Sequence, residues 1–148
     1  MKIYFDVCCL NRPYDDQTQD RIHLETVAIM AILKHIELKE WLWISSGVVN
    51  YEISKTTDEE RKCRLYSLVR WATEFVAVEQ DCYDRAKEIQ QQVGIKTYDA
   101  LHIACAEKGE ADVFLSTDDK LVKASKRKKK NIKIKVENPL KWLQEVIL

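Results

Sequence analysis

Four carboxylates lie where the ends of predicted strands and the first turns of predicted helices can bring side chains together. Asp6 directly follows an apolar run at residues 2–5, and Asp118 follows another at 113–115 after a short Ser-Thr turn. Asp99 lies in the first turn of a predicted helix, and Glu52 lies about two turns into the helix after a second strand. Carboxyl ends of parallel strands open on one edge of a sheet, so we expect these acids to converge. Taken singly, each also fits an ordinary role as an N-cap, a helix-dipole partner or a solvated residue.

The chemistry of such a cluster follows from its charge. Two unit charges 4 Å apart repel by about 4 kcal/mol at an effective dielectric near 20, so four carboxylates need protons or cations. Oxygen ligands alone favour hard ions such as Mg²⁺ or Mn²⁺ over zinc, and Mg²⁺ commonly binds substrate phosphate as well. The pattern therefore indicates metal-assisted attack of water on a phosphodiester.

The elements that position these acids alternate along the chain between short apolar runs and amphipathic stretches. This alternation predicts an α/β fold, and the shortness of the apolar runs favours a parallel sheet covered on both faces. Asn138-Pro139 is typical of a helix start, with Asn as N-cap and Pro at the first helical position. The predicted strands comprise residues 2–5, 41–44, 75–78, 113–115 and 132–136.

Length and composition limit the class of protein. The chain has 148 residues, 46% of them hydrophobic, with only 3 Gly and 2 Pro, which favours one domain over residues 1–148 and argues against disorder. No apolar stretch approaches the ~20 residues of a membrane span, and Asp6 interrupts any signal-peptide core. Five cysteines without a CxxC pair fit reduced thiols, so we expect a cytoplasmic protein.

The charges balance overall but are unevenly distributed. There are 24 basic and 24 acidic residues, yet residues 120–135 contain nine basic residues and no acid, which leaves −9 on the rest of the chain. This run is compatible with sequence-independent RNA contact or with a solvated surface turn. It contains no aromatic residue on which a base could stack. Its central residues Lys126, Arg127 and Lys128 are candidate substrate contacts.

Three further positions have both a functional and a structural interpretation. Arg12 lies in the loop after Asp6, where it would either clamp a phosphate or be a surface arginine. His102 shares a helix face with Asp99, but this pattern is more typical of a packed or hydrogen-bonded histidine than of a ligand or base. Cys8, followed by a second cysteine, is more typical of a packed thiol than of a reactive one.

The order of these motifs resembles the PIN-domain ribonucleases along essentially the whole chain. The stretch Asp99-Ala-Leu-His-Ile-Ala is the most specific part of the resemblance. The other parts are Tyr4-Phe-Asp6, the run from Ile44 to Glu52, Phe114-Leu-Ser-Thr-Asp118, and Asn138-Pro-Leu near the end of the chain.

The resemblance implies a three-layer α/β/α sandwich on a central, mostly parallel five-stranded sheet. It implies that Asp6, Glu52, Asp99 and Asp118 hold Mg²⁺ or Mn²⁺ and position the hydrolytic water, with Ser116 as the family's hydroxyl residue near the substrate. Asp119 adjoins Asp118, so either of the two can face the metal. Many small members are toxins of VapBC-type toxin-antitoxin pairs, so RNA as substrate, a cognate antitoxin and a homodimer are expected.

Two other functions are weighed against this interpretation. One is a catalytically inactive PIN-like module that binds RNA or a protein, which would have no use for an unneutralised carboxylate cluster. The other is a Mg²⁺-dependent phosphatase with an aspartyl nucleophile, a chemistry that commonly shows Asp-x-Asp after the first strand. Here Asp6-Val-Cys lacks the second Asp, which disfavours the phosphatase.

Overall fold

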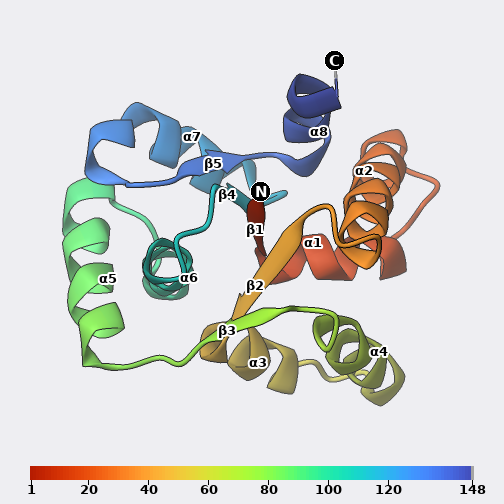
Figure 1. Ribbon diagram of the computed structural model, residues 1–148, viewed down its shortest axis with the longest axis horizontal. Coiled ribbons are helices and arrows are strands. Elements are labelled where there is room, and N and C mark those ends of the chain that lie inside the picture. Colours follow the sequence, from red (N-terminus) through yellow and green to blue (C-terminus); the bar gives the residue numbers. More distant parts are fainter. Residues whose placement is uncertain (148) are drawn as a thin grey trace.

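A computed structural model describes residues 1–147 and contains a five-stranded, wholly parallel sheet in the order β3-β2-β1-β4-β5 (Figure 1). The predicted three-layer α/β/α class is confirmed. The strands are β1 (Lys2–Phe5), β2 (Leu42–Ser46), β3 (Glu74–Val76), β4 (Val113–Leu115) and β5 (Lys135–Glu137).

Strand β1 is the centre of the sheet and of the core. It pairs with β2 on one side and with β4 on the other, where Phe5 is aligned with Leu115. Ile3, Tyr4 and Phe5 are almost completely buried, as expected for a parallel strand covered on both faces. Its end therefore holds the residue that follows, Asp6, at a fixed place on the carboxyl edge.

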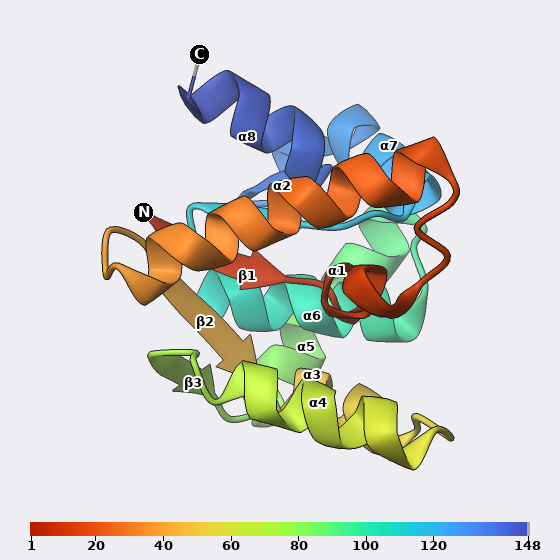
Figure 2. The same cartoon turned by 90° about the vertical axis from the view of Figure 1, so that its right-hand side faces the viewer.

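Helices cover both faces of the sheet. Figure 1 shows α5, α6 and α7 on one side, and α1, α2, α4 and α8 on the other. Figure 2 shows the long helix α2 lying across the sheet, with α8 packed against it. The helices are α1 (Val7–Asn11), α2 (Asp20–Glu37), α3 (Gly47–Ser54), α4 (Glu59–Val69), α5 (Gln80–Val93), α6 (Thr97–Lys108), α7 (Asp119–Arg127) and α8 (Pro139–Ile147), with 3-10 turns at Arg12–Tyr14 and Lys129–Asn131.

Helix boundaries follow local capping chemistry. The hydroxyl of Ser46 accepts the Val49 N–H at the start of α3, and the Asn138 side chain accepts the Leu140 N–H at the start of α8. Helix α5 ends at Gly94, whose φ of 76° is left-handed and strained for any residue with a Cβ. The predicted helix start at Asn138-Pro139 is thus confirmed.

Strand β5 differs from the prediction. The sequence predicts a strand over 132–136, but residues 129–131 form a 3-10 turn and β5 begins only at Lys135. Strand β5 pairs with β4, which has only three residues. A longer β5 would therefore have no neighbouring strand to hydrogen-bond with. Within residues 1–147, no helix is both long and apolar enough to cross a membrane.

Candidate functional site

Two of the predicted acids lie side by side at the carboxyl edge of the sheet. Asp6 follows β1 and occupies the N-cap position of α1, while Asp118 follows β4 and occupies that of α7. Strands β1 and β4 are neighbours, and the Asp6 N–H donates to the Leu115 carbonyl at 2.9 Å. The sheet topology therefore fixes the distance between the two segments.

The other two acids approach this edge of the sheet from helices. Asp99 lies in the first turn of α6, and Glu52 lies in α3, the helix that follows β2. Burial first, and then the charges of Asp6 and Asp118, raise the pKa of Asp99 to about 6, with a smaller contribution from Glu52. Each of the other three carboxylates thus acts on Asp99, as expected for a cluster of like charges.

Asp6 is the most buried member of the cluster, with 6% of its surface exposed. Desolvation raises the pKa of its carboxyl, although the His102 ring and the Ser116 hydroxyl lower it in part. Ser116 donates to Asp6 Oδ2 at 2.8 Å, and the Asp118 N–H donates to the same hydroxyl at 3.1 Å. One serine therefore links the two strand-end acids.

Ser116, which was expected near the substrate, lies beside Asp6. Its side chain is fully buried, and its hydroxyl supports the Asp6 carboxylate. The neighbouring Cys8 thiol lies 3.5 Å from the Ser116 hydroxyl and accepts the Thr117 N–H at 3.3 Å. As predicted, Cys8 is a packed thiol, and it packs against the Ser116–Thr117 segment that supports Asp6.

Glu52 is held by a chain of buried polar groups. Its Oε1 lies 2.9 Å from His102 Nε2, and His102 Nδ1 lies 2.7 Å from the hydroxyl of Tyr4. That hydroxyl in turn lies 2.6 Å from the Ser46 hydroxyl. Burial alone would lower the pKa of His102, but the hydrogen bond with Glu52 and the charge of Asp6 outweigh it and raise the pKa.

Three groups lie close enough to share a cation. Asp6, Glu52 and His102 each offer a ligand atom, and these atoms lie within 4.8 Å of one another. This group does not include Asp99 or Asp118. Both nitrogens of His102 already have hydrogen-bond partners, which leaves the carboxylate oxygens as the available ligands. Within residues 1–147, Asp6, Asp99 and Asp118 form no ion pair with Lys or Arg, so a bound cation would relieve their repulsion.

The structure distinguishes the two adjacent acids of α7. Asp118 Oδ1 accepts the N–H groups of Lys120 and Leu121, and its charge acts on Asp99. Asp119 is turned to Arg21, whose guanidinium donates two hydrogen bonds to it, at 2.6 and 2.8 Å. Asp118 is thus the member of the pair that acts on the cluster, whereas the Asp119 carboxylate is bound by Arg21.

Two of the basic residues predicted to contact the substrate are paired with acids outside the cluster. Arg12 donates to Glu25 at 2.9 Å and to Asp15 at 3.1 Å, so binding a phosphate would require it to give up a carboxylate. Lys126 forms an ion pair with the buried Glu137 at 2.7 Å. Residues 126–130, the basic segment, begin near the far end of α7, and this nine-residue helix separates them from Asp118 by about 13 Å.

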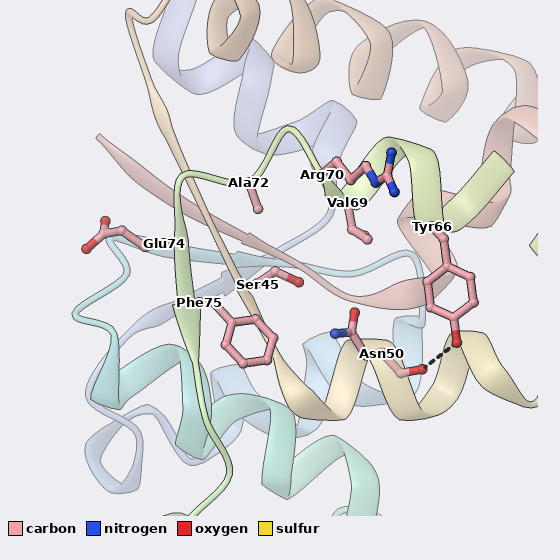
Figure 3. Close-up of a pocket in the computed structure, with 8 residues that line it drawn as sticks. All are labelled: Ser45, Asn50, Tyr66, Val69, Arg70, Ala72, Glu74 and Phe75. Atoms are coloured by element: carbon pink, nitrogen blue, oxygen red, sulfur yellow. Dashed lines mark hydrogen bonds between the residues drawn. The ribbon is translucent and has the colours of Figure 1, made fainter. Parts of the chain in front are cut away.

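A cavity of about 410 Å³ lies between α3, α4 and β3, away from the four acids (Figure 3). Its lining includes Ser45, whose buried hydroxyl lacks a partner in the part of the chain described. Figure 3 also shows Tyr66 donating to the Asn50 carbonyl, with Phe75 on the other side of Asn50. None of the clustered carboxylates lines this cavity, so it is a separate feature.

Fold and site together define an α/β protein with an acidic cluster at the carboxyl edge of a parallel sheet. The family model described as "PIN domain" matches residues 3–127, and the chain belongs to this family. No curated protein matches the chain.

Three solved structures share the fold at low sequence identity. FitAcB from Neisseria gonorrhoeae has a TM-score of 0.60 and 14% identity, over 93% of this chain and 97% of that one. VapBC2 from Rickettsia felis, bound to a DNA fragment from their promoter, has a TM-score of 0.60 and 17% identity, over 93% and 98%. PAE2754 from Pyrobaculum aerophilum has a TM-score of 0.52 and 14% identity, over 98% and 96%. These similarities confirm the fold.

Sequence reasoning considered His102 but missed Tyr4 and Ser46 as residues that support the site. The available signal was positional, because Tyr4 precedes Asp6 by two residues and His102 follows Asp99 by three. Such spacing places side chains on one face of a strand or helix.

Proposed function

We propose that this protein is a divalent-metal-dependent endoribonuclease that hydrolyses RNA phosphodiester bonds, and that it is the toxin of a type II toxin-antitoxin pair. PIN domains are generally nucleases, which supports hydrolysis of a nucleic acid. The choice of RNA follows from the resemblance to PIN-domain ribonucleases, and the choice of Mg²⁺ or Mn²⁺ is our inference from the acidic site.

One observation carries the proposal. A buried Asp6 and a half-buried Asp99 with a pKa near 6 lie with Glu52 and Asp118 in a cluster that, over residues 1–147, contains no Lys or Arg partner. A protein that used this edge only as a binding surface would bear the cost of this repulsion without benefit.

Each residue then has a role. Asp6, Glu52, Asp99 and Asp118 would hold Mg²⁺ or Mn²⁺, which supplies a more acidic water and neutralises charge on the phosphate. Ser116 holds Asp6 in place, and His102 holds Glu52. The exposed Arg127 and Lys128 would contact the RNA backbone at a distance from the reacting bond.

The assignment of partners also belongs to the proposal. The structures named FitAcB and VapBC2 are similar to this chain along nearly its full length, which supports a toxin with a cognate antitoxin. A homodimer in the cytoplasm is the form in which we expect the protein to act.

Calorimetry with Mn²⁺ and a short RNA tests the proposal. We expect wild-type protein to bind Mn²⁺ and Asp118→Asn to lose binding, because Asn can still cap α7 but carries no charge. Asp119→Asn is the matched control and should bind normally, since Arg21 already occupies Asp119. In a cleavage assay, Asp6→Asn and Asp99→Asn should each abolish metal-dependent hydrolysis.

The result that contradicts the proposal is equally clear. No binding by wild-type protein at millimolar Mn²⁺, with RNA present, would mean that the four carboxylates form no working metal site. The inactive RNA-binding or protein-binding module would then be the better description.

A further inference from the structure

A buried hydrogen-bonded chain runs from Ser46 through Tyr4 and His102 to Glu52. Its three links measure 2.6, 2.7 and 2.9 Å. Tyr4, Ser46 and His102 are fully buried, whereas Glu52 is only half-buried. The chain thus leads from the centre of the core to a carboxylate at the edge of the site.

Each residue of the hydrogen-bonded chain lies in, or directly before, an element that leads to an acid of the cluster. Tyr4 lies on β1, the strand that Asp6 directly follows, and His102 follows Asp99 by three residues on α6. Ser46 is the N-cap of α3, the helix that carries Glu52. The hydrogen-bonded chain therefore begins at the junction of β2 and α3, passes through β1 and α6, and ends on α3.

The side chains of this hydrogen-bonded network can all keep a hydrogen-bond partner whether His102 is neutral, with its proton on Nε2, or protonated on both nitrogens. With a neutral ring, Ser46 donates to Tyr4, Tyr4 donates to Nδ1, and Nε2–H donates to Glu52. With both ring nitrogens protonated, Nδ1–H donates to Tyr4 and Tyr4 donates to Ser46. A fully satisfied buried network fixes one geometry, because breaking any link leaves a buried group without a partner.

We propose that Tyr4 and His102 are positioning residues, which hold α3 against β1 and α6 so that Glu52, Asp6 and Asp99 stay at the spacing a divalent cation requires. This inference rests on the metal site of the proposed function. Residues that orient a metal ligand through a hydrogen bond commonly change metal affinity 10- to 100-fold when replaced.

Substitutions of Tyr4 and His102 distinguish a positioning role of the hydrogen bonds from a packing role of the rings. Tyr4→Phe keeps the ring that stacks on Phe114 at 5.3 Å but removes the hydroxyl that links His102 to Ser46. His102→Asn retains a polar group near the place of Nδ1 and loses the contact with Glu52. His102→Gln retains one near the place of Nε2 and can still donate to Glu52.

Calorimetric titration with Mn²⁺ alone gives the first readout. We expect Tyr4→Phe and His102→Asn to bind Mn²⁺ about 10- to 100-fold more weakly than wild type, and His102→Gln to bind less than tenfold more weakly. Ile29→Val is the matched control, because it removes one buried methylene from α2, which carries none of the four acids, and should leave Mn²⁺ affinity unchanged. Equal affinity in Tyr4→Phe and Ile29→Val, or equal losses in His102→Gln and His102→Asn, would overturn the inference.

Crystal structures of metal-free wild type and of Tyr4→Phe or His102→Asn give a second readout that does not depend on metal binding. In wild type, Glu52 Oε1 lies 2.9 Å from His102 Nε2. In the variants we expect the Glu52 carboxylate to move away from this place and α3 to shift relative to β1. An unmoved Glu52 would overturn the positioning role. If wild type bound no Mn²⁺ while Glu52 moved as expected, the proposed nuclease function would fail, and the inference would be reduced to its structural part, in which Tyr4 and His102 hold Glu52 in place.

Discussion

Replacing Asp99 by asparagine should stabilise the metal-free protein at neutral pH. Asp99 carries a negative charge there, although burial and the charges of Asp6 and Asp118 raise its pKa to about 6. The unfolded chain has an ordinary aspartate, with a pKa near 3.9. Folding at pH 7 therefore forces a charge into an unfavourable place, and Asp99→Asn removes that cost.

The size of the effect follows from the shift. One pKa unit corresponds to 1.36 kcal/mol, so the full shift would cost about 3 kcal/mol. Asp99 is only half-buried, and solvent screening reduces this to about 1.5 kcal/mol. Losing a charge from the first turn of α6 removes about 0.5 kcal/mol of helix-dipole stabilisation. The net gain is about 1 kcal/mol, or about 2–4 °C in Tm for a chain of this length.

The pH dependence gives the sign of the effect. A carboxyl whose pKa is raised on folding binds more protons in the native state, so its cost is absent well below pH 4, grows as pH rises and is complete above about pH 6. The advantage of Asp99→Asn should therefore be full at pH 7 and smaller at pH 5. With Mn²⁺ added the order should reverse, because only wild type gains binding energy.

Thermal unfolding followed by circular dichroism, in EDTA at pH 5 and pH 7, is the assay. Asp84→Asn changes an exposed carboxylate of α5 outside the cluster and is the matched control, with little expected change at either pH. A Tm for Asp99→Asn at or below that of wild type at pH 7 in EDTA would refute the reasoning. So would a gain of the same size at pH 5.

Two further predictions follow from charges away from the cluster. Replacing the five residues of the basic segment, 126–130, with serine should weaken RNA binding and flatten its salt dependence in fluorescence anisotropy, and an unchanged salt slope would remove this segment from RNA recognition. Arg12→Ala should lower the free energy of unfolding by about 2 kcal/mol in urea denaturation, because Glu25 is 1% exposed and loses its 2.9 Å partner while keeping Arg21. A loss below 0.5 kcal/mol would show that Arg12 is free to serve another purpose.

Most of the fold is predictable from local patterns. Apolar runs identified five strands. Residues that favour helix ends, such as Gly94 at a C-cap and Asn138-Pro139 at a helix start, predicted the helix boundaries correctly. Where local pattern and pairing compete, pairing decides the outcome. The alternating residues 132–136 predict a strand, but only a segment that can pair with the short β4 becomes one.

The placement of Asp6 and Asp118 after two strands of the sheet, and of Asp99 in a first helical turn, was predictable because strand ends and first helical turns are local features. Their supporting contacts were not, because these join residues far apart in the chain. Tyr4 and His102 are separated by 98 positions, as are Arg21 and Asp119. No local pattern shows that Arg21 would draw Asp119 away from the cluster, or that Glu25 would engage Arg12.

The central place of β1 has a consequence for the order in which the protein is made. Asp6 leaves the ribosome before β2 and β4, but its strand lies between these two strands, and β4 begins only at Val113. Ser116, which holds Asp6, and Asp118 follow shortly after. A growing chain therefore cannot assemble the acidic cluster until Asp118 has left the ribosome, more than one hundred residues after Asp6. A nuclease built this way would stay inactive throughout that interval of its translation and acquire its site in a single late step.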